Sequence, residues 1–234
     1  TAWRRVYQAG DETIMIGATK MINYPKTILS ALTMTALLVC TTSAQAVDFT
    51  SSEKAALKAG KTVRKPLADS GKNGFYGGAG YTLIDAPIDA VWSAIQDWAV
   101  YDDIFAATVE VKEVSRKGNR SLIHYKMGHK FISLEYFLDI KKDSKKYTMS
   151  FSLIENRPHD IAASKGYWRL FPQQGGRTLV AYVVTAKVPM GVVNMLKPQW
   201  KAMIERNLIG APNDVKKLIS SPKGQKYFSK TARK

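Results

Sequence analysis

An alternation of apolar and polar side chains, with a period of two residues, dominates the middle of the chain. Apolar side chains occupy every second position of residues 132–140: Ile132, Leu134, Tyr136, Leu138 and Ile140. This period predicts a β-strand with one face on the core. Residues 147–153 repeat the alternation, and the basic stretch 141–146 between the two segments predicts a hairpin tip.

More strands are predicted on both sides of this hairpin. They show the same alternation and are separated by turn residues such as Gly118 and Asn119. They cover residues 81–85, 109–111, 121–127, 166–170 and 180–184. Strands that follow one another through hairpins indicate a curved antiparallel sheet, here of about seven strands.

Apolar residues at intervals of three and four predict helices. Pro87 suits a first helical turn, and one helical face follows it over residues 88–95; a second short helix is expected over 98–105. A longer helix near the C-terminus keeps one apolar face: Trp200, Ile204, Leu208, Ala211, Val215 and Leu218. Pro198 and Pro212 predict kinks or breaks in this last helix.

Four segments give the chain a family resemblance: residues 84–92 (IDAPIDAVW), 101–105 (YDDIF), 166–170 (GYWRL) and 178–182 (TLVAY). Together with the order of elements, they resemble the START-like superfamily, also called SRPBCC. The similarity is greatest to its polyketide cyclase/dehydrase and lipid transport branch, which includes coenzyme Q-binding proteins. It covers residues 75–220.

The resemblance implies an α+β, helix-grip fold, with two short helices after the first strand and a sheet wrapped around the long C-terminal helix. It also implies an apolar cavity between sheet and helix that holds a hydrophobic ligand. START-like proteins are mostly binders of lipids, sterols, quinones or polyketides, and a minority are cyclases or hydrolases. The resemblance therefore favours a carrier.

Side chains on the inward faces of the strands and of the long helix are expected to line this cavity. Met190 and Val193, just before that helix, are placed where flexible side chains suit a gate. The predicted ligand-binding residues are Tyr136, Phe151, Trp168, Tyr182, Met190, Val193, Trp200, Met203 and Ile204. The alternative is a filled core without a pocket, because aromatic stripes usually only pack.

Residues 21–46 have the layout of a secretory signal peptide. Lys26 follows Met21, the mostly apolar run 28–39 comes next, and Ala44, Gln45 and Ala46 form a small-residue cleavage site. A membrane span needs about 20 apolar residues, more than this run supplies. We expect cleavage near Ala46 and a periplasmic or secreted protein.

Cys40, at the end of the apolar run, allows the alternative of a lipoprotein. This is the minority alternative, because lipoprotein signals resemble one another in having a small residue before the Cys, and Val39 stands there. Residues 1–20 are interpreted as upstream translation rather than structure. After residues 21–46, the expected organisation is a basic leader with a short helix (47–73), the ligand-binding domain (74–220) and a basic tail that frays (221–234). With a single Cys, an intramolecular disulfide is excluded.

The net charge of +16, from 35 Lys+Arg against 19 Asp+Glu, favours anionic partners. An exported protein rarely meets genomic DNA, so we expect a membrane surface and no nucleic acid. Four lysines of the predicted hairpin tip are the candidates for that contact: Lys141, Lys142, Lys145 and Lys146. The alternative is an ordinary solvated surface.

No pattern for covalent chemistry stands out. The glycine-rich stretch 74–80 lacks the Lys-Ser/Thr of a phosphate loop and is interpreted as a flexible entry to the first strand. His124 and His129 are five residues apart, on opposite faces of a strand, and His159 falls in a loop. The aspartates around the second short helix are expected to cap it: Asp97, Asp102 and Asp103.

We therefore expect a monomeric carrier of a hydrophobic small molecule or lipid, with no catalytic residue, metal or cofactor. Two alternatives stay open. One is an enzyme of the polyketide cyclase or hydrolase type that uses the same cavity. The other is an interaction protein of the cell envelope that keeps the fold with its core filled.

Overall fold

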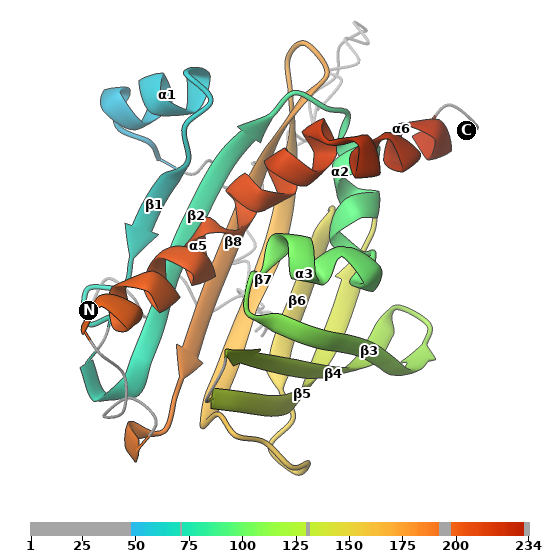
Figure 1. The fold of residues 1–234 in the computed structure, drawn as a ribbon. Coiled ribbons are helices and arrows are strands. Elements are labelled where there is room, and N and C mark those ends of the chain that lie inside the picture. Colours follow the sequence, from blue (N-terminus) through green and yellow to red (C-terminus); the bar gives the residue numbers. More distant parts are fainter. Residues whose placement is uncertain (1–47, 71, 130–131, 192–197, 232–234) are drawn as a thin grey trace, which may run out of the picture. The chain divides into compact units, whose positions relative to one another are not determined.

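One antiparallel sheet of eight strands carries the fold (Figure 1). The computed structural model describes residues 48–70, 72–129, 132–191 and 198–231. The strands are β1 (Val63–Pro66), β2 (Phe75–Ile84), β3 (Thr108–Lys117), β4 (Arg120–His129), β5 (Ile132–Asp143), β6 (Thr148–Leu153), β7 (Ala163–Gln173) and β8 (Arg177–Lys187). The helices are α1 (Ser51–Lys58), α2 (Ile88–Ile95), α3 (Tyr101–Ile104), α5 (Pro198–Ser220) and α6 (Gln225–Thr231), with short 3-10 turns η2 (Lys72–Gly74), η3 (Trp98–Val100) and η4 (Pro222–Gly224).

The strand order is β1-β2-β8-β7-β6-β5-β4-β3, and every neighbouring pair is antiparallel. The strands from β3 to β8 follow one another through hairpins, as the alternation predicts. The α+β class, the helix-grip order and the two short helical segments after the first long strand are confirmed. None of the helices in the described part of the chain has the length and apolar character needed to span a membrane.

The sheet has eight strands rather than about seven because β1 lies in the segment expected to be a leader. Its four residues pair with β2, with Val63 opposite Tyr81 and Pro66 opposite Gly78. Two cations fill its middle positions, so the strand shows no legible alternation in the sequence. The short helix expected in the same segment is present as α1, and Thr50 with Glu53 forms a capping box at its start.

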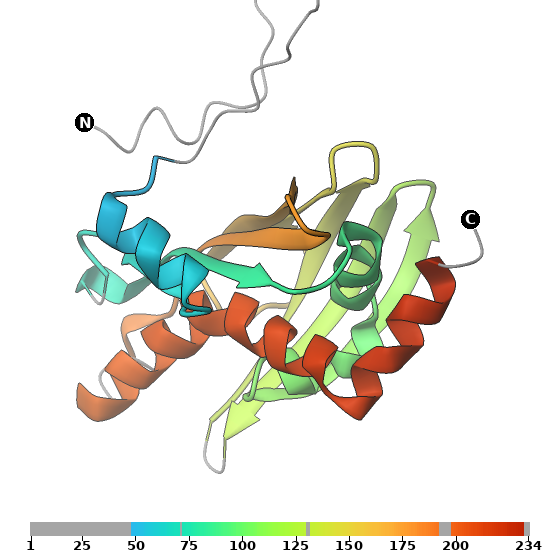
Figure 2. The ribbon, with the colours of Figure 1, turned by 90° about the horizontal axis from the view of Figure 1, so that it is seen from above.

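The sheet curves around α5, α2 packs against α6, and α3 lies beside α5 (Figure 2). Kinks or breaks are predicted at the two prolines of α5, and a break at Pro212 is excluded, because α5 runs continuously from Pro198 to Ser220. A kink at Pro212 stays a prediction. Pro198 is the first residue of the helix, where a missing N–H costs nothing. The predicted apolar face is maintained past Pro212, and Val215 and Leu218 are buried.

Glycines let α5 lie directly against β2. A Cβ on Gly80 would lie 2.0 Å from the carbonyl oxygen of Ile209 in α5. Gly77 and Gly78 have φ values of 147° and 146°, which favour glycine. The stretch expected to be a flexible entry is therefore regular strand β2, and its glycines serve close packing.

The basic tail was expected to fray, but residues 222–231 are helical and pack against α2. Tyr227 of α6 is 1% exposed and belongs to the main core, which lies on the concave face of the sheet. A smaller core lies on the opposite face, where Leu57 of α1 packs with Tyr81 and Val183. The apolar residues of α6 were missed because lysines surround them in the sequence.

Candidate functional site

A cavity of about 330 Å³ lies between the concave face of the sheet and the helical segments that cover it. Its volume falls at the lower end of the range of about 300–1,000 Å³ that is typical of small-molecule pockets. Strands β4, β5, β6 and β8 supply most of the wall: Ile123, Tyr125, Met127, Leu134, Tyr136, Leu138, Ile140, Met149, Phe151, Tyr182, Val184 and Ala186. These are the inward members of the alternating sets.

The cavity is covered by the segment that follows α2. Trp98 of η3, Tyr101 of α3, and Phe105 and Ala107 after it all contribute to the wall. Phe105 packs edge-on against Tyr125, with ring centroids 6.5 Å apart. Two short helices with aromatic side chains thus form a cover that does not fill the space beneath them.

Three of the predicted ligand-binding residues lie on this wall: Tyr136, Phe151 and Tyr182. Trp168 lies on the same face of the sheet, opposite Tyr182, but does not reach the cavity. Its ring centroid is 4.2 Å from that of Tyr182 and 6.3 Å from that of Phe105, and these two rings cover it. Trp168 is therefore a packing residue, 2% exposed.

Val188 still lines the cavity, but the chain leaves the sheet after it. Met190 is therefore 47% exposed and lies outside the cavity wall. Val193 falls outside the described residues. Trp200, Met203 and Ile204 belong to α5 by their backbone, and their side chains also fall outside the description. From α5, Leu208 reaches the cavity.

The sequence interpretation missed the aromatic residues of the cover and of β4. Tyr125 alternates with Ile123 and Met127, so the period-two pattern contained that signal. Trp98, Tyr101 and Phe105 had been treated only as a short helix. Their spacing of three and four residues did place them on one helical face.

Tyrosine hydroxyls are the main polar groups on the wall. The Tyr101 hydroxyl donates to the Ile95 carbonyl at 2.9 Å, and the Tyr125 hydroxyl lies 2.9 Å from Thr108 Oγ1. The Tyr136 hydroxyl donates to the sulfur of Met127 at 3.1 Å. Within the described residues, the Tyr182 hydroxyl makes no hydrogen bond, although Tyr182 is only 4% exposed.

Burial raises the pKa of each of these phenols. For Tyr101, Tyr136 and Tyr182 the pKa lies well above the ordinary value, because burial disfavours the phenolate. The described wall contains no Asp, Glu, His, Lys or Arg. The described wall is thus neutral and largely apolar, and its tyrosine hydroxyls stay protonated.

A second hollow adjoins the cavity and shares Leu134 and Ile161 with it. His159 and Asp160 lie in this hollow, on the loop between β6 and β7. His159 Nδ1 is 2.8 Å from the Ile161 carbonyl oxygen, and Asp160 accepts a hydrogen bond from the Glu135 N–H. Asp160 thus holds the loop against β5, whereas the His159 contact lies within the loop.

The described residues contain no cluster of His, Cys, Asp or Glu suited to a metal ion. His124 Nε2 is 3.4 Å from a Glu135 carboxylate oxygen, on the sheet. The side chain of His129 is outside the description.

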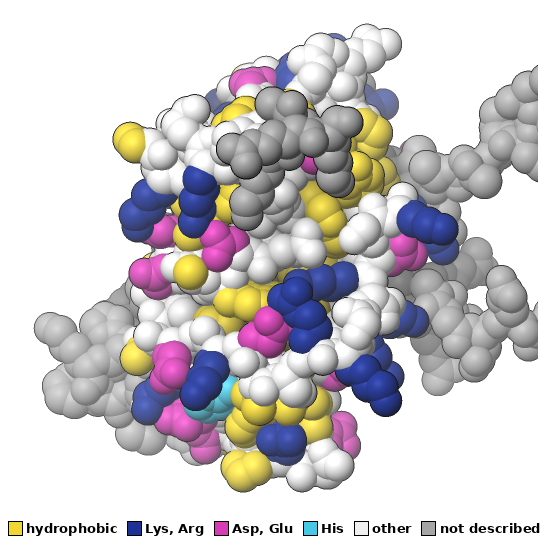
Figure 3. Space-filling model, turned by 90° about the vertical axis from the view of Figure 1, so that its right-hand side faces the viewer, with side chains coloured by type: hydrophobic (Ala, Val, Ile, Leu, Met, Phe, Trp, Pro, Cys, Tyr) yellow, Lys and Arg dark blue, Asp and Glu magenta, His cyan; other side chains and the backbone are white. Residues whose placement is uncertain are grey.

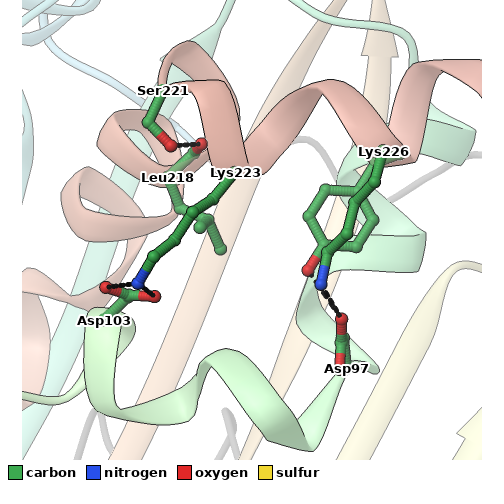
Figure 4. A network of polar contacts seen from close by, with 7 residues as sticks. Asp97, Asp103, Leu218, Ser221, Lys223 and Lys226 are labelled. Carbon is green, nitrogen blue, oxygen red and sulfur yellow. Dashed lines mark hydrogen bonds and ion pairs between the residues drawn. The ribbon is translucent and has the colours of Figure 1, made fainter.

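Two ion pairs hold the cover of the cavity from outside (Figure 4). Lys226 Nζ lies 2.7 Å from Asp97 Oδ2, which also accepts a hydrogen bond from the Tyr227 hydroxyl at 2.8 Å. Lys223 Nζ lies 2.9 Å from a carboxylate oxygen of Asp103. The helical tail thus contacts both ends of the segment that carries Trp98 and Tyr101.

The capping prediction holds for Asp97, which accepts a hydrogen bond from the Ala99 N–H at the start of η3. Burial acts to raise the pKa of Asp97, but hydrogen bonds from Lys226, Tyr227 and Ala99 outweigh it and lower the pKa. Asp103 does not cap a helix; its carboxylate pairs with Lys223 instead.

The four lysines of the predicted hairpin tip do not lie together. Strand β5 extends to Asp143, so Lys141 and Lys142 are strand residues on opposite faces of the sheet. Lys145 and Lys146 sit in the turn, where their backbone N–H groups donate to Asp143. Lys141 is exposed, whereas Lys142 is half-buried on the concave side.

Charges of both signs are interspersed on the face of the molecule seen in Figure 3, with hydrophobic side chains visible between them. Ion pairs on β3, β4 and β5 show the same mixing: Arg116 with Glu113, Arg120 with Asp139 and Lys126 with Glu135. The positive net charge therefore does not produce a uniformly basic surface on this side.

No protein-family model matches the sequence, and no curated protein matches it. Solved structures do resemble it. The Zhui aromatase/cyclase from Streptomyces sp. R1128 is 19% identical with a TM-score of 0.51, over 63% of this chain and 97% of that one. A STAR-related lipid transfer protein from Xanthomonas axonopodis is 11% identical with a TM-score of 0.51, over 69% and 93% of the two chains.

A START superfamily protein from Mycobacterium smegmatis is 10% identical with a TM-score of 0.50, over 62% of this chain and 97% of that one. The similar structures are thus START/SRPBCC-type proteins, some named for lipid transfer and others for cyclisation. At these identities the likeness establishes the fold.

Proposed function

We propose that this protein binds a hydrophobic ligand in the cavity on the concave face of its sheet and carries that ligand without changing it covalently. The observation that carries the proposal is the apolar cavity of about 330 Å³. Ligand surface buried there would gain about 25 cal/mol per Å² of apolar area, before the costs of lost motion. A lipid, a sterol or a quinone fits this chemistry.

The lack of an acid or base on the described wall favours a carrier over a cyclase or hydrolase. General acid–base chemistry needs a titrating group within about 3 Å of the reacting atom. Tyrosine hydroxyls with raised pKa values are poor bases, and three of them are engaged in hydrogen bonds. The likeness to an aromatase/cyclase therefore supports a shared fold more than a shared reaction.

The first test is to purify the exported protein from its own kind of host and identify bound molecules by native mass spectrometry and organic extraction. A stoichiometric lipid, sterol or quinone supports the proposal. A protein that carries no such molecule and takes up no fluorescent lipid contradicts it.

A matched pair of variants tests the location. Ala107→Phe adds a ring at a position on the cavity wall, whereas the neighbouring Ala106 is exposed and does not line it. We expect Ala107→Phe to weaken lipid binding at least tenfold and Ala106→Phe to leave it unchanged. Equal binding by both variants, each folded by circular dichroism, contradicts the cavity as the binding site.

We further propose that the carrier works in the cell envelope after residues 21–46 have been removed. The signal-peptide layout supports export, and N-terminal sequencing of the exported protein tests it. A chain that begins at Val47 agrees with the proposal, whereas one that retains residues 21–46 does not.

We also propose that the protein contacts an anionic membrane through the exposed lysines Lys141, Lys145 and Lys146. Each lysine near such a surface contributes about 1 kcal/mol. Cosedimentation with anionic and with zwitterionic vesicles, for the wild type and the triple alanine variant, tests it. Equal binding to both kinds of vesicle contradicts it.

A further inference from the structure

The concave face of β5 changes from apolar to cationic at one end of the cavity. Tyr136, Leu138 and Ile140 occupy alternate positions of the strand, and all three line the cavity. Lys142 is the next residue on that face. It stands directly opposite Met149 of β6, which also lines the cavity.

The Lys142 ammonium group forms no ion pair with a described residue. Its Nζ lies 5.0 Å from the centre of the Trp98 ring, and the side chain is half-buried. Within the described residues, Nζ forms neither an ion pair nor a hydrogen bond. A half-buried cation without a counter-ion is costly, because burial removes water that is not replaced by an acceptor.

Glu113, the acid whose charge acts on Lys142, is already engaged elsewhere. Glu113 accepts two hydrogen bonds of 2.8 Å from the guanidinium group of Arg116. Burial and then the charge of Arg116 lower the pKa of Lys142, while Glu113 acts in the opposite direction. The Arg116–Glu113 pair therefore leaves the charge of Lys142 uncompensated.

Trp98 provides a second donor without a partner at the same place. Trp98 lines the cavity, and its Nε1 is buried with no hydrogen-bond acceptor among the described residues. Buried N–H groups are nearly always paired, so an orphaned one in a ligand cavity points to an acceptor that a ligand would supply. The indole N–H and the ammonium group belong to side chains in direct contact.

We propose that Lys142 and Trp98 form the headgroup site of the cavity and select an amphipathic anion, with a carboxylate or phosphate on an apolar chain. The inference rests on the proposed function, since the chain of that ligand occupies the cavity. The anionic oxygens accept from Lys142 Nζ and Trp98 Nε1. Such charge-assisted hydrogen bonds are shorter and stronger than neutral ones.

The test compares three ligands that share a chain: dodecanoate, dodecyl phosphate and uncharged dodecanol. Their Kd values are measured by displacement of a fluorescent lipid from the wild type and from Lys142→Met, which keeps an unbranched side chain without the charge. Lys141→Met is the matched control, because Lys141 is exposed on the opposite face of the same strand. Trp98→Phe removes the indole N–H and keeps a ring.

We expect the wild type to bind at least one of the two anions at least tenfold more tightly than dodecanol, which corresponds to about 1.4 kcal/mol. Lys142→Met should abolish this preference, Trp98→Phe should reduce it, and Lys141→Met should retain it. The anion with the larger preference identifies the headgroup. Inorganic phosphate and acetate should fail to displace the lipid, which distinguishes an amphipathic anion from a free one.

Equal affinities for all three ligands in the wild type would overturn the headgroup site and leave the proposed function standing. An equal loss of preference in Lys141→Met and Lys142→Met would overturn it too, since diffuse charge would then explain the effect. Displacement by inorganic phosphate or acetate alone would refute the amphipathic ligand. A failure of all three ligands to bind would contradict the proposed function itself.

Discussion

Replacing Gly80 by alanine tests the close contact between β2 and α5 on which one side of the cavity depends. The added Cβ would lie 2.0 Å from the Ile209 carbonyl oxygen and 3.3 Å from Pro212 Cδ. Both obstacles lie in the helix, and the first is backbone, which no rotamer change can move. Helix and strand must separate by roughly 1 Å before the first contact reaches 3.0 Å.

Overpacking of this kind costs about 1–3 kcal/mol. For a domain of this size, each kcal/mol lowers the Tm by about 2–4 °C, so we expect Gly80→Ala to melt about 2–12 °C below the wild type. The displacement of α5 also moves Leu208, which is next to Ile209 in the helix; Leu208 lines the cavity. Weaker lipid binding should therefore accompany the lower Tm.

Gly191 provides the matched control for this substitution. A Cβ there would meet no atom within 4 Å, and the residue has no positive φ. Gly191→Ala should change the free energy of unfolding by less than about 0.5 kcal/mol. Urea unfolding and differential scanning calorimetry measure both variants. An unchanged Tm in Gly80→Ala, or equal losses in the two variants, would refute the close-contact reasoning.

Two further predictions concern single polar groups. Asp97 has a lowered pKa, so its contribution to the stability of the folded protein is complete above the ordinary value of 3.8 and is lost as the pH falls through the folded-state value. The difference in stability between wild type and Asp97→Asn should therefore shrink below pH 3.8. A difference independent of pH would contradict this. Tyr101→Phe removes a buried hydrogen bond to Ile95 and should lower the free energy of unfolding, measured in urea, by about 1 kcal/mol. Tyr182→Phe removes no hydrogen bond within the described residues and should cost less. The reverse order would contradict this assignment of hydrogen bonds.

The sheet was predictable from the sequence because several strands of the meander alternate between buried and more exposed side chains. Residues 132–140 show this best: Tyr136, Leu138 and Ile140, on the inward face of β5, are buried. Strand β1 was not predictable, because an alternation over only four residues cannot be distinguished from chance. Its pairing with β2 depends on tertiary contact rather than local pattern.

The break considered at Pro212 shows the opposite error, in which a local rule was applied where packing overrides it. A proline inside a helix removes one hydrogen bond and crowds the preceding turn. Around Pro212 the helix is held against β2, and Ile209 and Val215 on either side of it are buried. The contact of α5 with β2 thus compensates for the lost bond, and no sequence window contains that contact.

The candidate site was predictable only in part, because alternation identifies the inward face without identifying its cover. Tyr136, Phe151 and Trp168 lie on the same face of the sheet. Trp168 is removed from the cavity by Phe105, which comes from a segment more than sixty residues away in the sequence. Whether an inward ring lines a cavity or only packs is decided by the element above it.

That cover in turn depends on residues that never touch the cavity. Asp97 and Asp103 flank Trp98 and Tyr101, and they are held by Lys226 and Lys223 from the helical tail. Exposed ion pairs contribute little singly, but the Tyr227 hydroxyl joins Asp97 from a side chain that is 1% exposed. Burial of Tyr227 against α2 fixes the tail first, and the two ion pairs then orient the cover. The volume left for a ligand is therefore set jointly by the sheet and by η4 and α6.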